Sequence, residues 1–392
     1  MKAQEVFKSY QDNVMPTYTK LPLIFVKGKG SRLWDIQNKV YLDFFPGWGV
    51  GSLGHCHPKV VAAVREQASK LIFVANNFYN LPQAKLAAEI NYWSYPGKVF
   101  FCNSGAEANE GAIKLARKFG EGRFEIITFT DSFHGRTLAA ITATGQKKYQ
   151  EGFAPLPEGF KTVKFNDLEA VKAAITDKTV GVMLELIQGE GGINIAGKEF
   201  VLGLRKICDE KKLLLIVDEV QTGIGRTGKL FCFQYYGIIP DIMTLAKALG
   251  GGLPIGVMVA KKEIADILGP GTHASTFGGS PLVCKAALAV LKAIQEEKLL
   301  SNAQKMGEYL FARLNELKNK YSIIQETRGI GLMAGVELKI EGKAIVQKCL
   351  EKGLLINCTH ERVLRLMPAL NITKKDIDQA VYILDSVFLA IS

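Results

Sequence analysis

Residues 238–260, IIPDIMTLAKALGGGLPIGVMVA, form the stretch that decides the fold. Their apolar length imitates a membrane span, but Pro240, Asp241, Lys247 and Pro254 break or charge such a helix, as do three consecutive glycines. The stretch therefore predicts a buried strand, a glycine turn and a second buried strand. The first residues, MKAQEVFKSYQDNV, lack the apolar region of a secretory signal, so we expect a cytoplasmic protein that does not enter a membrane.

Similar apolar runs occur at KVFFC (98–102), FEIITF (124–129), VGVMLELI (180–187) and LLLIV (213–217). Such runs, separated by helical or loop segments, are typical of strands buried on both faces and predict a large, mostly parallel α/β sheet. After Pro281, two helical patterns and strand-like segments indicate a smaller α+β domain, which ends in a helix from about Thr373. We predict an N-terminal segment of short strands over 1–45 that packs with the small domain, a large domain over 46–285 and the small domain over 286–392.

The composition is that of a globular protein whose core needs no disulfide or structural metal. Of 392 residues, 48% are hydrophobic and 22% charged, which allows a sizeable core. The net charge is +11, but Lys and Arg are spread along the chain without a basic block, so a solvated surface is favoured over a nucleic-acid site. The seven cysteines are scattered, without CxxC pairs or zinc-ligand spacing, so we expect free thiols and no metal site.

Lys247 is the first candidate for chemistry, because it lies in an apolar neighbourhood just before a glycine triplet. Burial of an ammonium group is costly, so the pKa of a buried lysine falls and the neutral amine becomes available. A neutral amine is what an aldehyde cofactor needs for covalent attachment. A lysine that reaches out to solvent is the commoner explanation of this feature taken alone.

Two further motifs point to a ligand with a ring nitrogen and a phosphate. Asp218 follows the apolar run 213–217, at the carboxyl end of a predicted buried strand, where open α/β sheets bind ligands. Ser104 and Glu107 in NSGAEANE match a capping box, and the helix that follows offers its N-terminus to an anion. The ordinary alternatives are a surface aspartate and a simply capped helix.

The segment GIGRTG, residues 223–228, fits the GxGxxG pattern of dinucleotide-binding proteins and follows a predicted strand. However, four residues separate it from that strand, and the KLFCFQYYG after it is aromatic and β-like rather than a helix start. We therefore interpret it as a flexible glycine loop. A dinucleotide-binding dehydrogenase stays a remote alternative, as does a basic nucleic-acid-binding module.

Seven motifs follow one another in the order typical of one family: LGHCHP, NSGAEANE, SFHGRT, QGEGG, DEVQTGIGRTG, KALGGGLPIG and STFGGSP. Through them the chain resembles the class III aminotransferases of fold type I, from LWDIQNKVYLDF near the start to VLRLMPALNIT near the end. The resemblance implies a large domain with a mostly parallel, seven-stranded-type sheet that binds pyridoxal 5′-phosphate. It also implies a homodimer with shared active sites.

For the cofactor ring, the resemblance implies that Lys247 is the Schiff-base lysine and proton shuttle and that Asp218 is the partner of the pyridine nitrogen. Gln221 would bind the ring hydroxyl, while Val220 and Phe133 would pack against the ring.

For the rest of the cofactor, the same resemblance places the phosphate at Ser104, Gly105 and Ala106. Thr276 would reach the phosphate of the neighbouring subunit. Glu219, within the DEVQ motif, is a further cofactor-binding candidate.

For the substrate, Arg136 and Arg365 are candidate carboxylate forks, because a guanidinium binds a carboxylate through two hydrogen bonds. Ser275 is expected to bind substrate as well. Glu190 would pair with Arg365 in one half of the reaction and release it in the other. A structural ion pair is the alternative for each arginine.

Within the class, the motifs are most similar to those of acetylornithine aminotransferases. The reaction that this implies moves the δ-amino group of N-acetylornithine to 2-oxoglutarate, giving N-acetylglutamate semialdehyde and glutamate in arginine biosynthesis. Ornithine, succinylornithine, N-succinyl-diaminopimelate and 4-aminobutyrate stay open as amino donors. A racemase or aminomutase would use the same lysine without consuming 2-oxoglutarate.

Three positions depart from the family pattern. Trp48 stands where ornithine aminotransferases tend to carry a tyrosine, and Leu186 and Ala369 each replace a usual proline. Indole lacks the acceptor oxygen of a phenol, which disfavours free ornithine as the donor. We expect all three positions near the substrate pocket, where they would bear on the acyl group that is accepted.

Overall fold

The stretch at 238–260 folds as the predicted strand, turn and strand. In the computed structural model, which describes residues 2–391, β11 (Ile242–Leu245) and β12 (Gly256–Lys261) run antiparallel, with Met243 opposite Val259. The turn between them contains Gly251 and Gly252 at φ +59° and +112°, a conformation that glycine adopts without strain. Among residues 2–391, no helix combines the length and apolar character needed to cross a membrane.

The two strands belong to a sheet of seven, in the order β4-β12-β11-β10-β7-β5-β6. Every neighbouring pair is parallel except the two pairs that β12 makes, with β11 and with β4. The predicted large, mostly parallel sheet is thus confirmed. Its remaining strands are β4 (Gly97–Cys102), β5 (Glu125–Phe129), β6 (Phe160–Val163), β7 (Thr179–Leu184) and β10 (Leu214–Asp218).

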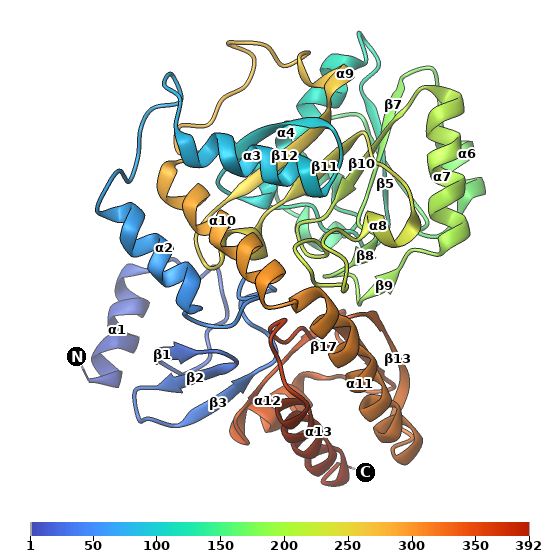
Figure 1. Ribbon diagram of the computed structural model, residues 1–392. Helices are drawn as coiled ribbons and strands as arrows, with labels where there is room; N and C mark the ends of the chain where they lie inside the picture. The colour runs from blue at the N-terminus through green and yellow to red at the C-terminus, as the bar shows by residue number, and fades with distance from the viewer. Residues whose placement is uncertain (1, 392) are drawn as a thin grey trace.

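Both faces of this sheet are buried, which explains the continuous apolar runs. Along β10, Leu215 and Val217 pack into the main core, whereas Leu214 and Ile216 pack with α4 on the opposite face. Figure 1 shows helices on both sides of the sheet. They are α2 (Pro58–Ala68), α3 (Leu81–Trp93), α4 (Gly105–Phe119), α5 (Leu138–Ala143), α6 (Leu168–Ala174), α7 (Lys198–Lys211), α8 (Phe233–Tyr236), α9 (Lys262–Ala265) and α10 (Pro281–Glu296).

The C-terminal part forms a second, antiparallel sheet in the order β13-β14-β17-β16. Its strands are β13 (Ile324–Ile330), β14 (Met333–Leu338), β16 (Asn357–Thr359) and β17 (Val363–Leu366). Three helices accompany it, α11 (Leu299–Lys320), α12 (Lys343–Glu351) and α13 (Lys374–Leu389). The side chain of Thr373 caps α13, as the predicted helix start requires.

The N-terminal strands join the C-terminal part in a third sheet, β1-β2-β3-β15. In it β15 (Leu354–Leu355) lies parallel to β3 (Val40–Asp43), with Leu354 opposite Leu42. The other two strands are β1 (Phe25–Lys29) and β2 (Arg32–Asp35), and Figure 1 shows β3 on the side of the sheet toward α12. This pairing accords with an N-terminal segment that packs on the small domain, while the boundaries at 45/46 and 285/286 stay predictions. A short two-stranded sheet, β8 (Ile187–Gln188) with β9 (Asn194–Ile195), completes the strands.

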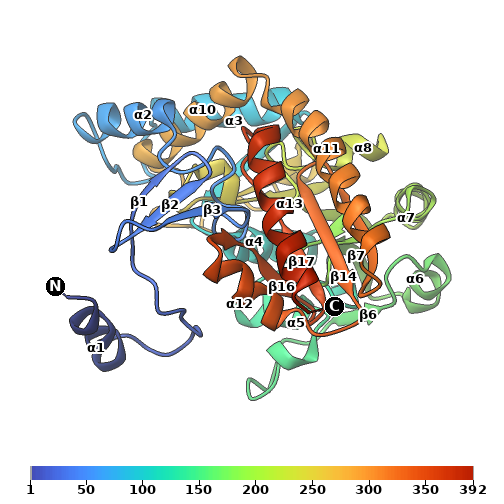
Figure 2. The same ribbon diagram turned by 90° about the horizontal axis from the view of Figure 1, so that it is seen from below.

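The expectation of strands throughout residues 1–45 is wrong at the start, where α1 (Ala3–Asn13) is a helix. The carboxylate of Glu5 accepts a hydrogen bond from the backbone of Lys2 at 2.9 Å, which satisfies one of the free amides at the helix N-terminus. No residue of α1 is buried, and Figure 2 shows the helix set apart from the rest of the chain. Local capping, rather than packing within this chain, supports the helix.

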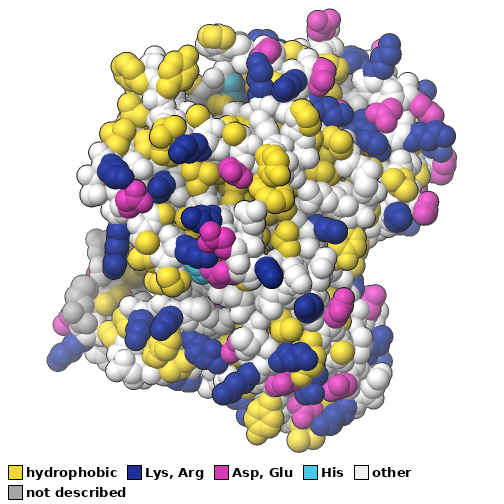
Figure 3. All heavy atoms as spheres, viewed as in Figure 1, with side chains coloured by type: hydrophobic (Ala, Val, Ile, Leu, Met, Phe, Trp, Pro, Cys, Tyr) yellow, Lys and Arg dark blue, Asp and Glu magenta, His cyan; other side chains and the backbone are white. Residues whose placement is uncertain are grey.

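The surface carries its charge in a mixed pattern. On the face drawn in Figure 3, Lys and Arg side chains alternate with Asp and Glu and with apolar side chains, without a continuous basic stripe. Ion pairs on the described surface join both near and distant positions of the sequence, such as Lys70 with Glu66 at 2.7 Å and Lys59 with Glu296 at 2.8 Å. Exposed pairs of this kind contribute little to stability.

Candidate active site

Lys247 lies directly after β11, in the turn that leads to β12, with φ +45°. Loss of hydration around the ammonium lowers the pKa of Lys247 to about 8. Glu190 and Asp218 nearby raise this pKa, and Arg365 lowers it. Nearby charges and partial burial thus set the pKa of Lys247 together, and a large fraction of its amine is neutral near pH 8.

Asp218 ends β10 and is 3% exposed. Its Oδ2 accepts hydrogen bonds from Asn109 Nδ2 and pairs with His134 Nδ1, both at 2.8 Å, while Oδ1 accepts from the backbone of Val220 at 3.0 Å. Thr244, its neighbour on β11, donates to Asn109 Oδ1 at 2.7 Å. The carboxylate is thus fixed in one orientation by a buried, hydrogen-bonded network.

Sequence reasoning missed both side chains that hold Asp218. Asn109 lies in NSGAEANE and His134 in SFHGRT, so the motifs contained the signal without showing that the two segments meet. His134 is buried, and its Nε2 has no hydrogen-bond partner among the described atoms.

Glu185 is a second buried carboxyl group that sequence reasoning did not assign. It is 3% exposed and accepts hydrogen bonds from the backbone amides of Phe133 at 2.9 Å and Gly189 at 3.2 Å. Burial raises the pKa of Glu185 to about 7, although His134 opposes the shift. The two backbone bonds fix the segment that carries Phe133, the predicted ring-stacking side chain.

The predicted phosphate cup lies at the start of α4. Ser104 Oγ accepts a hydrogen bond from the backbone of Glu107 at 3.2 Å and donates to the Glu107 carboxylate at 2.8 Å, so Ser104 caps the helix as predicted. A Cβ on Gly105 would lie 2.8 Å from Val220 Cγ1, which only glycine avoids. The free amides at this N-terminus favour an anion, and Val220 stands directly beside them.

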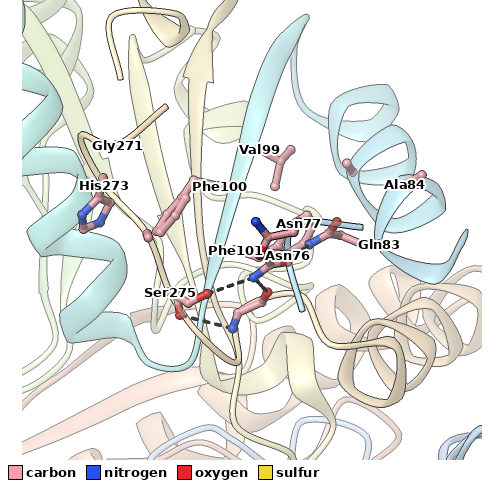
Figure 4. Close-up of a pocket in the computed structure, with 13 residues that line it drawn as sticks. Asn76, Asn77, Gln83, Ala84, Val99, Phe100, Phe101, Gly271, His273 and Ser275 are labelled. Atoms are coloured by element: carbon pink, nitrogen blue, oxygen red, sulfur yellow. Dashed lines mark hydrogen bonds between the residues drawn. The ribbon is translucent and has the colours of Figure 1, made fainter. Parts of the chain in front are cut away.

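The segment that carries Ser275 runs beside this helix start. Asn103 donates to Ser275 Oγ at 3.1 Å, and Asn76 donates to the Ser275 carbonyl at 2.9 Å. Figure 4 shows Asn76 and Ser275 facing each other at one end of a cavity of about 580 Å³. Thr276 is exposed next to them, and its reach to the phosphate of another subunit stays a prediction.

Arg365 and Glu190 form a buried ion pair, with Nη1 2.8 Å from Oε1. The same Nη1 donates to the Gly189 carbonyl at 2.7 Å and to Gln221 Oε1 at 3.3 Å, and the Arg365 side chain is 0% exposed. The Arg365 guanidinium lies 5.0 Å from the ring of Phe45. Glu190 is thus paired with Arg365, and Gln221 belongs to the same cluster, while the roles of Glu190 and Arg365 toward the substrate stay predictions.

Arg136 has the opposite environment. Its side chain is exposed, and none of the ion pairs formed by the described residues includes it. Its guanidinium carbon lies 4.1 Å from the centroid of the Tyr149 ring and 5.4 Å from that of Phe133. The edge of the guanidinium therefore stays available for a carboxylate, whereas that of Arg365 is occupied.

Glu219 is held by the fold. Its carboxylate accepts hydrogen bonds from the backbone amides of Cys232 at 2.9 Å and Phe233 at 2.7 Å and from Thr222 Oγ1 at 2.7 Å. These bonds assign the side chain to the start of α8, and burial raises the pKa of Glu219 to about 7. Its cofactor contact stays a prediction.

The GIGRTG segment differs from the flexible loop that we expected, because it is buried. Arg226 is 1% exposed and donates to the carbonyls of Leu332 at 3.0 Å and Pro368 at 2.5 Å and to Ser52 Oγ at 2.9 Å. The loop continues in turns until α8, the short helix that replaces the β-like segment predicted there. The loop therefore holds the segments of Ser52, Leu332 and Pro368 together, and it does not lead into a helix of the dinucleotide-binding kind.

The three departures from the family pattern do not all face the pocket. Leu186 and Ala369 are 0% and 1% exposed and belong to the packed interior, so they contribute to packing rather than to substrate contact. Trp48 is 48% exposed and lies edge-on to Phe45 at 5.5 Å. Of the three, Trp48 is the one whose side chain reaches accessible space.

A partly neutral lysine, a fixed carboxylate at a strand end and an anion-ready helix together define a class of enzymes that bind an aldehyde cofactor carrying a phosphate. Comparison with known proteins agrees. The family model described as "Aminotransferase class-III" matches residues 14–388. This chain belongs to the class III aminotransferases, whose reaction depends on pyridoxal phosphate.

Individual relatives narrow the comparison. The chain is 54% identical to an acetylornithine aminotransferase of Caldanaerobacter subterraneus, covering 95% of this chain and 96% of the relative. It is 52% identical to an acetylornithine aminotransferase of Methanocaldococcus jannaschii, covering 95% of each chain. The crystal structure of an ornithine aminotransferase from Toxoplasma gondii superposes with a TM-score of 0.96 at 34% identity, covering 100% of this chain and 96% of the other.

Capture of pyridoxal phosphate by the cofactor-free protein is expected to accelerate as the pH rises through about 8. The neutral amine is the reactive form, and the lowered pKa of Lys247 raises its fraction from about one tenth at pH 7 to about nine tenths at pH 9. Stopped-flow absorbance of the bound cofactor measures the rate. A profile that keeps rising to a midpoint near the ordinary lysine value would contradict the burial argument, and Lys262→Ala, which changes an exposed lysine, serves as the control.

Proposed function

We propose that the protein transfers the δ-amino group of N-acetylornithine to 2-oxoglutarate, giving N-acetylglutamate semialdehyde and glutamate, as a step of arginine biosynthesis. The observation that carries the proposal is the unequal state of the two arginines, Arg136 with a free edge and Arg365 covered by Glu190. N-Acetylornithine has one carboxylate, far from its δ-amine, and 2-oxoglutarate has two. The exposed Arg136 can bind the one carboxylate of N-acetylornithine. When Glu190 releases Arg365, the two arginines together can bind the two carboxylates of 2-oxoglutarate.

Residues from four segments fit pyridoxal phosphate. Lys247 would hold it covalently through its neutral amine, and Asp218 would face its ring nitrogen. Val220 and Phe133 would enclose the ring, with Gln221 at its hydroxyl. When bound, the cofactor supplies an electron sink for the carbon that bears the amine.

The phosphate would rest on the first amides of α4, at Ser104, Gly105 and Ala106. Lack of a side chain at Gly105 leaves room beside Val220, and the helix dipole favours the dianion.

Lys247 also moves the proton. With the cofactor bound, Lys247 Nζ would be the base that takes the proton from the substrate carbon bearing the amine, since a lysine with a pKa of about 8 is a competent base at neutral pH. The charges of Glu190 and Asp218 raise the pKa of Lys247 and so oppose the effect of burial.

The two arginines, Arg136 and Arg365, would bind the carboxylates of the two substrates differently. Arg136 would bind the α-carboxylate of the donor, and Glu190 would keep Arg365 neutralised while the donor chain passes. With 2-oxoglutarate, Glu190 would release Arg365 to the second carboxylate. Ser275, beside the helix start, would add a hydrogen bond on the side opposite the forks.

Trp48 supports an acylated donor. Its indole is half exposed next to Phe45, and it offers a flat apolar surface without an acceptor for a free α-ammonium group. The names of the two relatives, both acetylornithine aminotransferases, point the same way. Free ornithine is the second candidate, since the superposed structure is that of an ornithine aminotransferase.

We further propose a homodimer in which Thr276 completes the phosphate site of the partner subunit. Apolar side chains are exposed around this segment, among them Phe277 at 64% and Phe78 at 66%. The α1 helix likewise buries none of its residues within one chain. Exposed apolar area of this kind is typical of a surface that a second copy covers.

A panel of amino donors tests the function. With 2-oxoglutarate as acceptor, N-acetylornithine is expected to give the highest kcat/KM, with ornithine lower by roughly 10-fold or more, because one unmatched buried ammonium costs about 1.4 kcal/mol or more. Glutamate release is the readout. A preference for ornithine would move the protein to the second candidate, and turnover without glutamate would indicate a racemase or aminomutase.

A further inference from the structure

Tyr149 is a side chain that neither the motifs nor the proposed roles account for. It ends a 3₁₀ turn (Lys147–Tyr149), and its ring centroid lies 4.1 Å from the guanidinium carbon of Arg136. The same ring meets Phe133 edge-on, with centroids 5.5 Å apart and planes at 78°. One aromatic ring thus touches both the predicted substrate fork and the predicted cofactor-stacking side chain.

We infer that Tyr149 is a positioning residue, whose ring holds Arg136 in the orientation that receives the substrate carboxylate. The inference rests on the proposed function, since it assumes that Arg136 binds that carboxylate. Tyr149 itself has no part in the bond-making steps.

The stacking geometry leaves the arginine competent to bind. A guanidinium stacks on a ring through its flat face, and its N–H groups point outward from its edge, so stacking and bidentate carboxylate binding do not compete. Arg136 is exposed and belongs to no ion pair of the described chain, so the ring is its main restraint. Without it, the long side chain would have to be ordered at the moment of binding.

The turn that carries the ring is anchored on both sides. Gln150, the next residue, donates from Nε2 to the carbonyls of Ile141 at 3.1 Å and Thr144 at 3.0 Å, at the end of α5. Gln146 donates to the carbonyl of Ser132 at 3.1 Å, directly before Phe133. The turn is therefore tied to the same segment that carries Arg136, and the position of the ring follows that of the site.

A second cation lies near the ring and requires a control. Lys148 Nζ is 5.1 Å from the Tyr149 centroid, farther than the guanidinium of Arg136. A lysine is a strongly hydrated point charge with no planar face, so it does not replace the stacked arginine.

The test compares Tyr149→Leu, which removes the ring, with Tyr149→Phe, which keeps it. For Tyr149→Leu, KM for donor and acceptor is expected to rise by about fivefold to tenfold, the size of a cation–π contact, while kcat stays within about twofold. The dissociation constant of glutarate, an unreactive dicarboxylate, measured by calorimetry on the holoenzyme, is expected to rise equally. Tyr149→Phe and Lys148→Ala are expected to match the parent protein.

Two results would overturn the inference: unchanged KM and glutarate affinity in Tyr149→Leu, or an equal loss in Tyr149→Phe, which would point to the hydroxyl. Thermal unfolding of each variant shows whether the leucine change perturbs the fold, and a lowered kcat with unchanged KM would mark that general damage and count against positioning. The variant Arg136→Lys distinguishes failure of the inference about Tyr149 from failure of the proposed role of Arg136. If it raises KM and Tyr149→Leu does not, only the inference fails; if it leaves KM unchanged, the proposed role of Arg136 fails as well.

Discussion

Replacing Lys247 with alanine is expected to lower kcat by on the order of 10⁴-fold, because the change removes the proton carrier together with the covalent anchor of the cofactor. The visible absorbance of the lysine-bound cofactor should disappear, and pyridoxal phosphate should become removable by gel filtration. Alanine keeps the same backbone conformation at φ +45°, so the fold is expected to survive.

Lys262→Ala is the matched control, since it removes an exposed lysine at the start of α9 and should leave colour and rate unchanged. Addition of methylamine to Lys247→Ala should restore part of the rate if the missing function is that of an amine. Retention of both colour and turnover in Lys247→Ala would refute the assignment.

Replacing Asp218 with asparagine is expected to lower kcat by on the order of 10²-fold and to weaken cofactor binding, because the negative charge opposite the ring nitrogen is lost. The new amide would also present hydrogens to Asn109 and His134, two groups that now donate to the carboxylate. Turnover at saturating pyridoxal phosphate and the dissociation constant of the cofactor are the two measurements.

Asp241→Asn separates this effect from a general loss of stability. Asp241 is a buried carboxylate just before β11 that pairs with Arg205 at 2.8 Å and Lys261 at 2.7 Å, away from the proposed ring site. Its loss is expected to lower the thermal unfolding temperature and to leave kcat unchanged. If Asp218→Asn behaves like Asp241→Asn, the carboxylate at the end of β10 supports only the fold.

The large sheet was predictable because the sequences of its strands indicate burial on both faces. Runs such as LLLIV at 213–217 stay apolar at every position, which happens only when both faces of a strand are covered, and the structure places α4 on one face of β10 and the main core on the other. The strand, turn and strand at 238–260 was predictable from the glycine triplet between two apolar runs, but the antiparallel course of β12 was not predicted, because apolar runs alone do not give strand direction. Helix α1 was missed because residues 1–45 were interpreted as short strands, although Val6, Phe7 and Tyr10 have the spacing of one helix face.

The candidate site was predictable only where a motif carried it. Asn109 and His134 converge on Asp218 from different segments, and no spacing within the sequence states which segments meet in space. Glu219 was predicted near the cofactor because it follows Asp218; its carboxylate accepts a hydrogen bond at the start of α8, and its contact with the cofactor stays a prediction. GIGRTG was taken as flexible because glycine is permissive, whereas the packing around Arg226 immobilises it.

The pairing of β15 with β3 has a consequence for biosynthesis. The N-terminal sheet receives its fourth strand from residues 354–355, more than three hundred positions along the chain from β3. During synthesis on the ribosome, the edge of β3 stays unpaired until β15 has emerged, which is late in the chain. All strands of the large sheet emerge earlier. Nascent chains of this protein therefore carry an unpaired strand edge for most of their synthesis, and that edge is where a chaperone has the longest opportunity to bind.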